Sequence, residues 1–260
     1  MPLRAYGLTD KGRVRPTNED CFAIEEQLGL CVVADGMGGH RAGAIAARLA
    51  VDAIVDYVRE RSANLPAARA THGWPFGFDP SLSADGNLLR TAVHVAGMRI
   101  REAAISSNGC AGMGTTIVAA RVAGARLSVA HVGDSRLYLV AGRTVRQLTQ
   151  DDSWMVSMLA EDPGADRLLL EHHPMRSALT NVVGARSRTE VHVAEQALAG
   201  GELLLLSTDG VHDVLDGSRI ERLVLEEESP QAIAHAIVGT ALTRGSGDNC
   251  TAVVARYTLN

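Results

Sequence analysis

Three short apolar segments follow one another in the middle of the chain with almost nothing between them. They read GTTIVAARV, ARLSVAHVG and SRLYLVAG, and the turns that join them are AGA and DS. Such short turns can join neighbouring strands only if the strands are antiparallel, because a parallel pair needs a crossover of roughly a dozen residues or more. This succession therefore favours antiparallel sheets over a parallel sheet of alternating strands and helices.

Further strands are expected near both ends of the chain, with helices between the strand groups. Segments typical of strands are RAYGLTD, CFAIEEQ, LGLCVVAD, RTEVHVAEQ, GELLLLSTDG and CTAVVARYTL, and the second and third form a hairpin. A helical period runs for about five turns after Arg41 and returns over 87–106, 154–171, 218–225 and 230–243. Pro163 and Gly164 break the third of these helices. We therefore expect an α+β fold, a central antiparallel β-sandwich with helices on both sides.

The stretch 65–85 separates the first two helices and contains three prolines. We interpret it as a surface loop that Trp74, Phe76 and Phe78 pin to the scaffold, with a contact to a partner or substrate as the alternative.

The composition limits the class of protein. The 260 residues are 46% hydrophobic, which suits one domain over residues 1–260 with a core of full size. A net charge of −5 argues against a general nucleic-acid binder. The N-terminus has no apolar signal core, and no apolar run reaches about 18 residues, so we expect a cytoplasmic protein without a membrane partner. The four cysteines form no CxxC pair and are expected to be buried, reduced thiols: Cys21, Cys31, Cys110 and Cys250.

Acidic residues recur where strands stop. Asp35, Asp134 and Asp209 follow apolar segments, Asp248 precedes one, and each has a glycine neighbour. One such pair usually marks a turn, but four of them are harder to explain in that way. Carboxylate and carbonyl oxygens are the ligands that Mg²⁺ and Mn²⁺ prefer. The pattern indicates a divalent-metal site where these strand ends converge.

Six motifs occur in a fixed order over nearly the whole chain. They are RPTNED (15–20), ADGMGGH (34–40), GTT (114–116), HVGDSRLY (131–138), STDG (207–210) and GDN (247–249). Together they resemble the metal-dependent serine/threonine protein phosphatases, the PPM or type 2C family, in its compact bacterial form. The resemblance implies the same β-sandwich with flanking helices and a flap near the active site, here about 152–184.

The resemblance also implies a set of metal ligands. Asp35 matches the acid that bridges two ions, and the carbonyl of Gly36 matches a ligand of one of them. Asp209 and Asp248 match the acids that complete the shell of the first ion. Asp134 matches the acid that, with Asp209, holds a weaker third ion in bacterial members. The implied cofactors are two Mn²⁺ or Mg²⁺ ions and, as in those members, a third.

Other matched positions surround the ions. Asp20 matches an acid that positions metal-bound water, and Glu19 matches a direct or water-mediated ligand in some relatives. Arg15 stands five residues before Asp20, as the phosphate-binding arginine of the family does, and a guanidinium can grip two phosphate oxygens. Asn249 is expected to orient Asp248, with a plain turn residue as the alternative. The implied catalytic residues are Asp35, Asp20 and Arg15.

Two histidines are expected to have structural roles. His40 is expected to brace the loop before the first long helix, and His131 to be a satisfied core histidine. In the flap, LTQDDS matches a family stretch that often reads DHS, so Asp152 departs from the pattern. We expect this departure to affect local packing or substrate contacts, not metal chemistry.

The implied reaction is hydrolysis of phosphoserine and phosphothreonine monoesters by a metal-activated water. The expected partners are phosphorylated proteins of a cognate serine/threonine kinase pathway, with no nucleic acid, and the chain is expected to be a monomer. One alternative is a phosphatase dedicated to a sigma-factor regulator, which would share all six motifs. The other is a non-catalytic pseudophosphatase that binds phosphoproteins, whose sign would be loss of the metal-binding acids.

Overall fold

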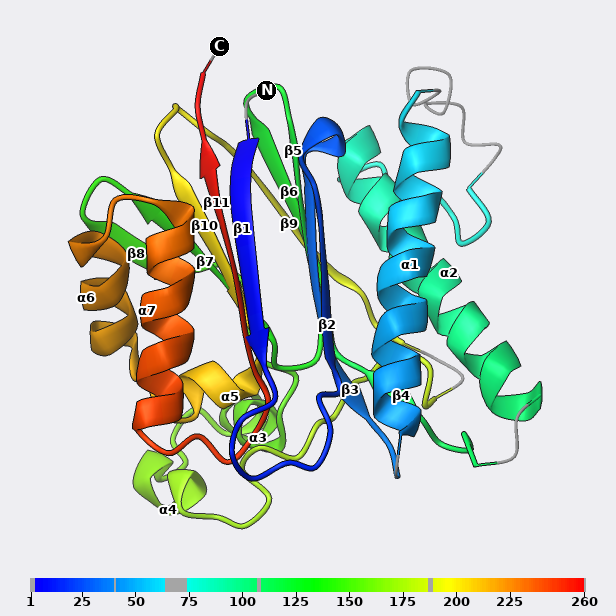
Figure 1. Ribbon diagram of the computed structural model, residues 1–260. Helices are drawn as coiled ribbons and strands as arrows, with labels where there is room; N and C mark the ends of the chain where they lie inside the picture. The colour runs from blue at the N-terminus through cyan, green and yellow to red at the C-terminus, as the bar shows by residue number, and fades with distance from the viewer. Residues whose placement is uncertain (1–2, 40, 64–73, 107–108, 187–188, 260) are drawn as a thin grey trace.

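Two antiparallel sheets lie face to face in the computed structural model, which describes residues 3–39, 41–63, 74–106, 109–186 and 189–259 (Figure 1). One sheet has the order β1–β11–β10–β7–β8, with the bounds Leu3–Asp10, Cys250–Tyr257, Leu203–Ser207, Arg136–Ala141 and Thr144–Gln147. The other has the order β2–β3–β5–β6–β9, with the bounds Asp20–Glu25, Leu30–Met37, Ile117–Ala123, Arg126–Val132 and His192–Ala197. The short β4 (Gly114–Thr115) pairs with β3, and a 3₁₀ turn (Glu26–Leu28) joins β2 to β3.

Helices cover the outer face of each sheet. On one side, α1 (Ala42–Ser62) and α2 (Ala84–Ser106) run side by side in opposite directions. On the other side lie α6 (Gly217–Glu226) and α7 (Pro230–Thr243), while the short α5 (Asp209–His212) follows β10. The layers are therefore helix, sheet, sheet and helix, which confirms the expected α+β sandwich.

Strand β3 shows why its sequence is apolar without interruption. The side chains of Cys31 and Val33 enter the core between the two sheets, whereas Val32 and Ala34 belong to the core beneath α1 and α2. Successive side chains of a strand point to opposite faces, and both faces of this sheet are covered. The strand carries its first exposed group only where it leaves the core, after Ala34.

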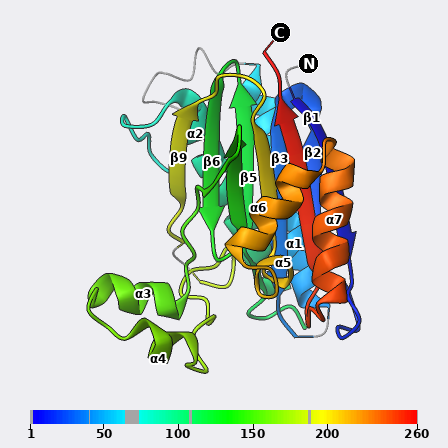
Figure 2. The ribbon, with the colours of Figure 1, turned by 90° about the vertical axis from the view of Figure 1, so that its left-hand side faces the viewer.

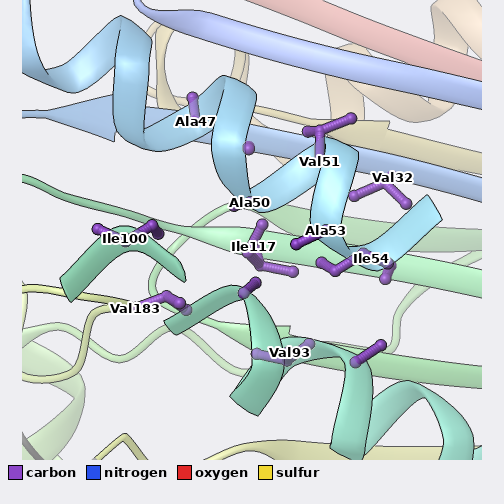
Figure 3. Packing of buried hydrophobic residues seen from close by; sticks show 14 of the residues in the cluster. Val32, Ala47, Ala50, Val51, Ala53, Ile54, Val93, Ile100, Ile117 and Val183 are labelled. Carbon is purple, nitrogen blue, oxygen red and sulfur yellow. The ribbon is translucent and has the colours of Figure 1, made fainter. Parts of the chain in front are cut away.

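Small side chains let α1 lie close to its sheet. Figure 3 shows alanines of α1 packed against β-branched residues of the sheet and of α2: Ala47, Ala50, Ala53, Val32, Ile117 and Val93. A core built in this way needs few aromatic residues, in keeping with an aromatic content of 3%.

The second long helix begins three residues earlier than its apolar period predicts. Ser83 caps it, because the Ser83 Oγ accepts a hydrogen bond from the Gly86 N–H at 3.1 Å. Asn87, a polar residue at the predicted start, is fully buried and its amide donates to the carbonyls of Asp79 and Ser83. Because the first turn of this helix is polar, the apolar period of the sequence does not mark where the helix starts.

The aromatic loop is described from Trp74 onward, and positions 65–73 lie outside the described residues. Trp74 is buried and its ring lies 5.8 Å from that of Phe78, while Phe76 lies 4.8 Å from His94 of α2. The described part is therefore held to the scaffold by aromatic contacts, as expected.

The flap projects from one end of the sandwich, as Figure 2 shows. Its two helices, α3 (Trp154–Glu161) and α4 (Arg167–Glu171), are separated at Pro163 and Gly164, as the sequence indicates. His131 is buried in β6 and its Nε2 lies 3.0 Å from the Gln150 carbonyl, whereas His40 lies outside the described residues. No helix in the described ranges is both long and apolar enough to cross a membrane.

Candidate functional site

Strand ends from both sheets meet at one end of the sandwich and line a cleft of about 470 Å³. The cleft is lined by eight of the nine residues that the sequence singles out: Arg15, Glu19, Asp35, Gly36, Asp134, Asp209, Asp248 and Asn249. The ninth, Asp20, lies directly opposite Asp35 in the pairing of β2 with β3. Residues more than 200 positions apart in the chain are thereby brought to one place.

The GTT motif fixes the backbone of Asp35. The Thr115 hydroxyl and the Thr116 N–H both donate to the Asp35 carbonyl, at 2.7 and 2.8 Å, and the Asp35 N–H donates to the Thr116 hydroxyl at 3.1 Å. These contacts use only the main chain of Asp35, so its carboxyl group is left for the cleft. The motif belongs to the family resemblance, but its physical role is visible only in the structure.

Gly36 has no room for a side chain. A Cβ at this position would lie 2.1 Å from the Gly43 carbonyl oxygen and 2.8 Å from that of Glu19. The glycine therefore lets the first turn of α1 and the loop before β2 close against the end of β3. Close approach of three main-chain segments, and not a special φ angle, explains the first glycine after Asp35.

Asp20 is held from the opposite sheet. Its Oδ2 accepts hydrogen bonds from the hydroxyls of Thr208 and Thr251, at 2.9 and 2.6 Å. Its Oδ1 is buried and has no partner in the described structure. The carboxyl group is therefore fixed in orientation with one oxygen free. Thr208 belongs to the STDG motif, but nothing in the sequence indicated that it or Thr251 contacts Asp20, which lies 188 and 231 residues away from them.

The acids of the cleft are costly to ionise together. Burial, and then the charge of Asp209, raises the pKa of Asp134 to about 8. Burial raises the pKa of Asp20 to about 7 and that of Asp209 to about 6, with nearby acids adding to both shifts. The pKa of Asp35 lies well above its ordinary value because of burial and then the charges of Asp20 and Asp209. A positive charge among these groups would reverse the cost.

The donor set fits a hard divalent cation. It offers several carboxylates and the Gly36 main chain, and the Oδ1 atoms of Asp20 and Asp209 are buried without a partner in the described structure. No three acidic, histidine or cysteine groups among the described residues are arranged as a metal-binding group. A change of side-chain conformation would have to complete such a site.

Arg15 is already paired with one of these acids. Its guanidinium is about half exposed, forms an ion pair with Asp248, and has its pKa raised by that hydrogen bond. A cation bound by Asp248 would compensate the carboxylate charge and free Arg15 to turn toward a ligand in the cleft.

Asn249 holds the loop that carries Arg15 and Glu19. Its Oδ1 accepts from the Glu19 N–H at 2.8 Å, and its Nδ2 donates to the carbonyls of Lys11 and Thr17 at 2.8 and 3.0 Å. Only its main-chain N–H reaches Asp248, at 2.8 Å from Oδ1. The side chain thus positions the entrance loop, a contact that the sequence did not reveal.

Asp152, the residue that departs from the family pattern, ties the flap to the cleft. Its carboxylate accepts hydrogen bonds from the Gly133 N–H at 2.9 Å and from Asn181 at 2.8 Å, and pairs with His192 Nε2 at 2.9 Å. Although burial opposes it, these partners lower the pKa of Asp152. Since Gly133 precedes Asp134, Asp152 joins the base of the flap to the strand end that carries a cleft acid.

Comparison with known proteins agrees with this arrangement. The family model described as Protein phosphatase 2C matches residues 13–237. The serine/threonine phosphatase stp of Listeria welshimeri is 32% identical over 262 residues, covering 99% of this chain and 97% of that protein. The crystal structure of the Mycobacterium tuberculosis serine/threonine phosphatase PstP/Ppp is similar with a TM-score of 0.82 and 29% identity, covering 98% of this chain and 99% of that one.

A second solved structure is that of the PstP catalytic domain in complex with 2 manganese ions, with a TM-score of 0.77, 26% identity and 98% of both chains covered. The family match spans most of the chain, and the fold and the six motifs accord with it. The chain therefore belongs to the protein phosphatase 2C family of metal-dependent serine/threonine phosphatases.

Proposed function

We propose that the cleft hydrolyses phosphoserine and phosphothreonine monoesters at a centre of two divalent ions, Mn²⁺ or Mg²⁺. The observation that carries this proposal is the convergence of Asp35, Asp134, Asp209 and Asp248 from separate strand ends on one cleft. The 2 manganese ions in the similar PstP structure support a divalent cofactor of this kind.

The acids divide between the ions. Asp35 would bridge two ions, with the Gly36 carbonyl on one of them, and Asp209 and Asp248 would complete the first site. Asp134, buried beside Asp209, would hold a weaker third ion with it. When bound, such ions supply a water of lowered pKa as nucleophile and positive charge for the phosphoryl oxygens.

The chain itself supplies binding and orientation. Arg15, released from Asp248, would bind two phosphoryl oxygens and stabilise the charge that they carry in the transition state. The free Oδ1 of Asp20 would accept a hydrogen bond from the attacking water, and Thr208 and Thr251 keep that oxygen aimed. Glu19, on the rim of the cleft, would contact an ion directly or through water.

We further propose that the chain acts as one catalytic domain and a monomer, reversing a serine/threonine kinase in the cytoplasm. Its four cysteines are free and buried, which suits a reducing compartment. The relatives are named serine/threonine phosphatases, which gives no support to a dedicated sigma-factor role. A pseudophosphatase is disfavoured too, because the four acids are present.

The direct test is turnover of p-nitrophenyl phosphate. Activity should require Mn²⁺ or Mg²⁺, disappear in EDTA and return when the metal is restored. Titrating each metal separately would also show which one supports turnover at the lower concentration. Full activity in EDTA would refute the metal-dependent reaction.

The Arg15→Ala variant should raise KM for a phosphopeptide by about tenfold or more, the loss expected for hydrogen bonds between charged groups. Its Mn²⁺ affinity should not fall, since Arg15 competes for Asp248 when the cleft holds no ion. Steady-state kinetics and calorimetry on the same protein measure the two effects. Arg13→Ala is the matched control, because Arg13 is exposed on the same loop and does not line the cleft. Lost Mn²⁺ binding with an unchanged KM would count against the phosphate role.

A further inference from the structure

A second cavity, of about 1010 Å³, lies against the same flap segment as the catalytic cleft. We call it the α2 pocket, and its polar wall includes Arg90, His94, Arg101, Thr180, Arg186 and His192. Leu179 lines the catalytic cleft and the next residue, Thr180, lines the α2 pocket. Leu179 pairs with Ser153 in an isolated antiparallel bridge, and successive side chains of an extended chain point to opposite sides. The two cavities are thus neighbours separated by one stretch of chain.

One stripe of α2 forms the base of the pocket. Arg90, His94, Gly97 and Arg101 stand four, three and four residues apart, which places them on one helix face. A Cβ on Gly97 would lie 3.3 Å from the Arg101 guanidinium and 3.5 Å from Val183. Glycine weakens a helix interior by about 0.5–1 kcal/mol relative to alanine, and here it keeps the base of the pocket open beside a cation.

Three guanidinium groups are oriented by main-chain carbonyls. Arg90 donates to the Gly77 carbonyl at 3.2 Å, Arg101 to that of Arg186 at 3.4 Å, and Arg186 to that of Thr180 at 2.8 Å. A guanidinium has five donor hydrogens, so each keeps several for a ligand. Within the described part of the chain, no salt bridge joins any of the three to a carboxylate.

The pocket is electrostatically positive. Two acids line it, but Asp152 is already engaged by Gly133, Asn181 and His192, which leaves only the exposed Glu190. The pKa of His94 is lowered by burial and then by the charges of Arg90 and Arg101, so both arginines act on a side chain at the base of the pocket. Three oriented guanidiniums facing one free carboxylate suit a ligand with two negative charges.

We propose that the α2 pocket binds a second phosphoryl group of the phosphoprotein substrate, carried a few residues from the phosphate that is hydrolysed. The inference rests on the proposed function, because it assumes that a phosphorylated chain occupies the catalytic cleft. An extended chain covers about 3.3 Å per residue, so a phosphoryl group a few residues from the hydrolysed one can reach past the single stretch of chain between the cavities. The enzyme would therefore favour substrates with clustered phosphates.

The test compares three substrates: p-nitrophenyl phosphate, a peptide with one phosphothreonine, and the same peptide with a non-hydrolysable phosphonate side chain. The phosphonate is placed at each spacing of about three to six residues on either side. At the best spacing it should lower KM about tenfold for the unaltered enzyme. The Arg90→Gln/Arg101→Gln double variant should lose this gain while its turnover of p-nitrophenyl phosphate stays unchanged.

Two further variants test whether the gain depends on the arginines of the pocket. Arg99→Gln is the matched control, because Arg99 is exposed on the same helix and reaches Asp56 of α1 instead of the pocket, and it should retain the whole gain. Arg186→Gln changes an exposed loop residue and should lose part of the gain even if the double variant proves unstable in a thermal melt.

No gain at any spacing, or a gain retained in the double variant, would overturn the proposal. Binding of methylphosphonate alone, measured by the NMR shift of His94, tests whether the pocket is a site for free anions. If it binds but no peptide shows a gain, the pocket serves a free anion and the substrate role is wrong. Failure of the unaltered enzyme to hydrolyse p-nitrophenyl phosphate would instead refute the proposed function.

Discussion

The Asp35→Asn variant should lose turnover of p-nitrophenyl phosphate by a factor on the order of 10³ or more. Metal ions contribute several kcal/mol to the transition state, and each 1.4 kcal/mol or so corresponds to a factor of ten. Asparagine keeps the size of the side chain but removes the charge and one oxygen ligand, so it cannot bridge two cations. The fold should survive, because the contacts with Thr115 and Thr116 use the main chain of residue 35.

Calorimetric titration with Mn²⁺ should show weaker binding in the same variant. Asp213→Asn is the matched control: it removes another acid whose pKa burial raises, one turn after Asp209, but Asp213 does not line the cleft. The control should keep most of its activity. An Asp35→Asn enzyme with full turnover would rule out the two-ion assignment, and an equal loss in both variants would point to a general effect of charge.

The architecture could be predicted because it depends on short-range patterns. The turn AGA joins β5 to β6, which pair antiparallel as expected, whereas DS takes the chain from β6 in one sheet to β7 in the other. The change of period after Arg41 marked a helix that begins at Ala42. The start of α2 was misplaced for a physical reason: its first turn is polar and is held by a buried Asn87, which the apolar period does not register.

The cleft acids could also be located, since each stands at the end of an apolar strand and matches a family motif. The hydrogen bonds that hold these acids could not be predicted. Thr208 and Thr251 reach Asp20 from 188 and 231 residues away, and the local sequence around a threonine does not show which distant carboxylate its hydroxyl contacts. The same holds for Asp152, whose departure from the family pattern makes sense only beside Asn181 and His192. Side-chain networks across the sandwich require the three-dimensional structure.

Without metal, the protein should become less stable as pH rises. The native pKa values of Asp209, Asp20 and Asp134 are raised to about 6, 7 and 8, above the ordinary value of 3.8. In this range the folded state therefore holds more protons than the unfolded state, and the free energy of unfolding falls with pH. The stabilising contribution is complete below about pH 4 and is lost by about pH 8. Since one pKa unit is worth about 1.4 kcal/mol, the raised pKa of Asp134 alone corresponds to a loss of several kcal/mol.

Urea unfolding in EDTA between about pH 5 and pH 8 measures this loss. Adding Mn²⁺ should restore more stability at the upper end, because ionised carboxylates bind the cation without first releasing protons. Asp134→Asn should flatten the upper part of the curve, since it removes the acid whose pKa is about 8. Glu161→Gln, on an exposed turn of the flap, should leave the curve unchanged. Stability in EDTA that is constant or rises toward pH 8 would show that the cleft acids are not held protonated, and would remove the electrostatic reason for a cation among them.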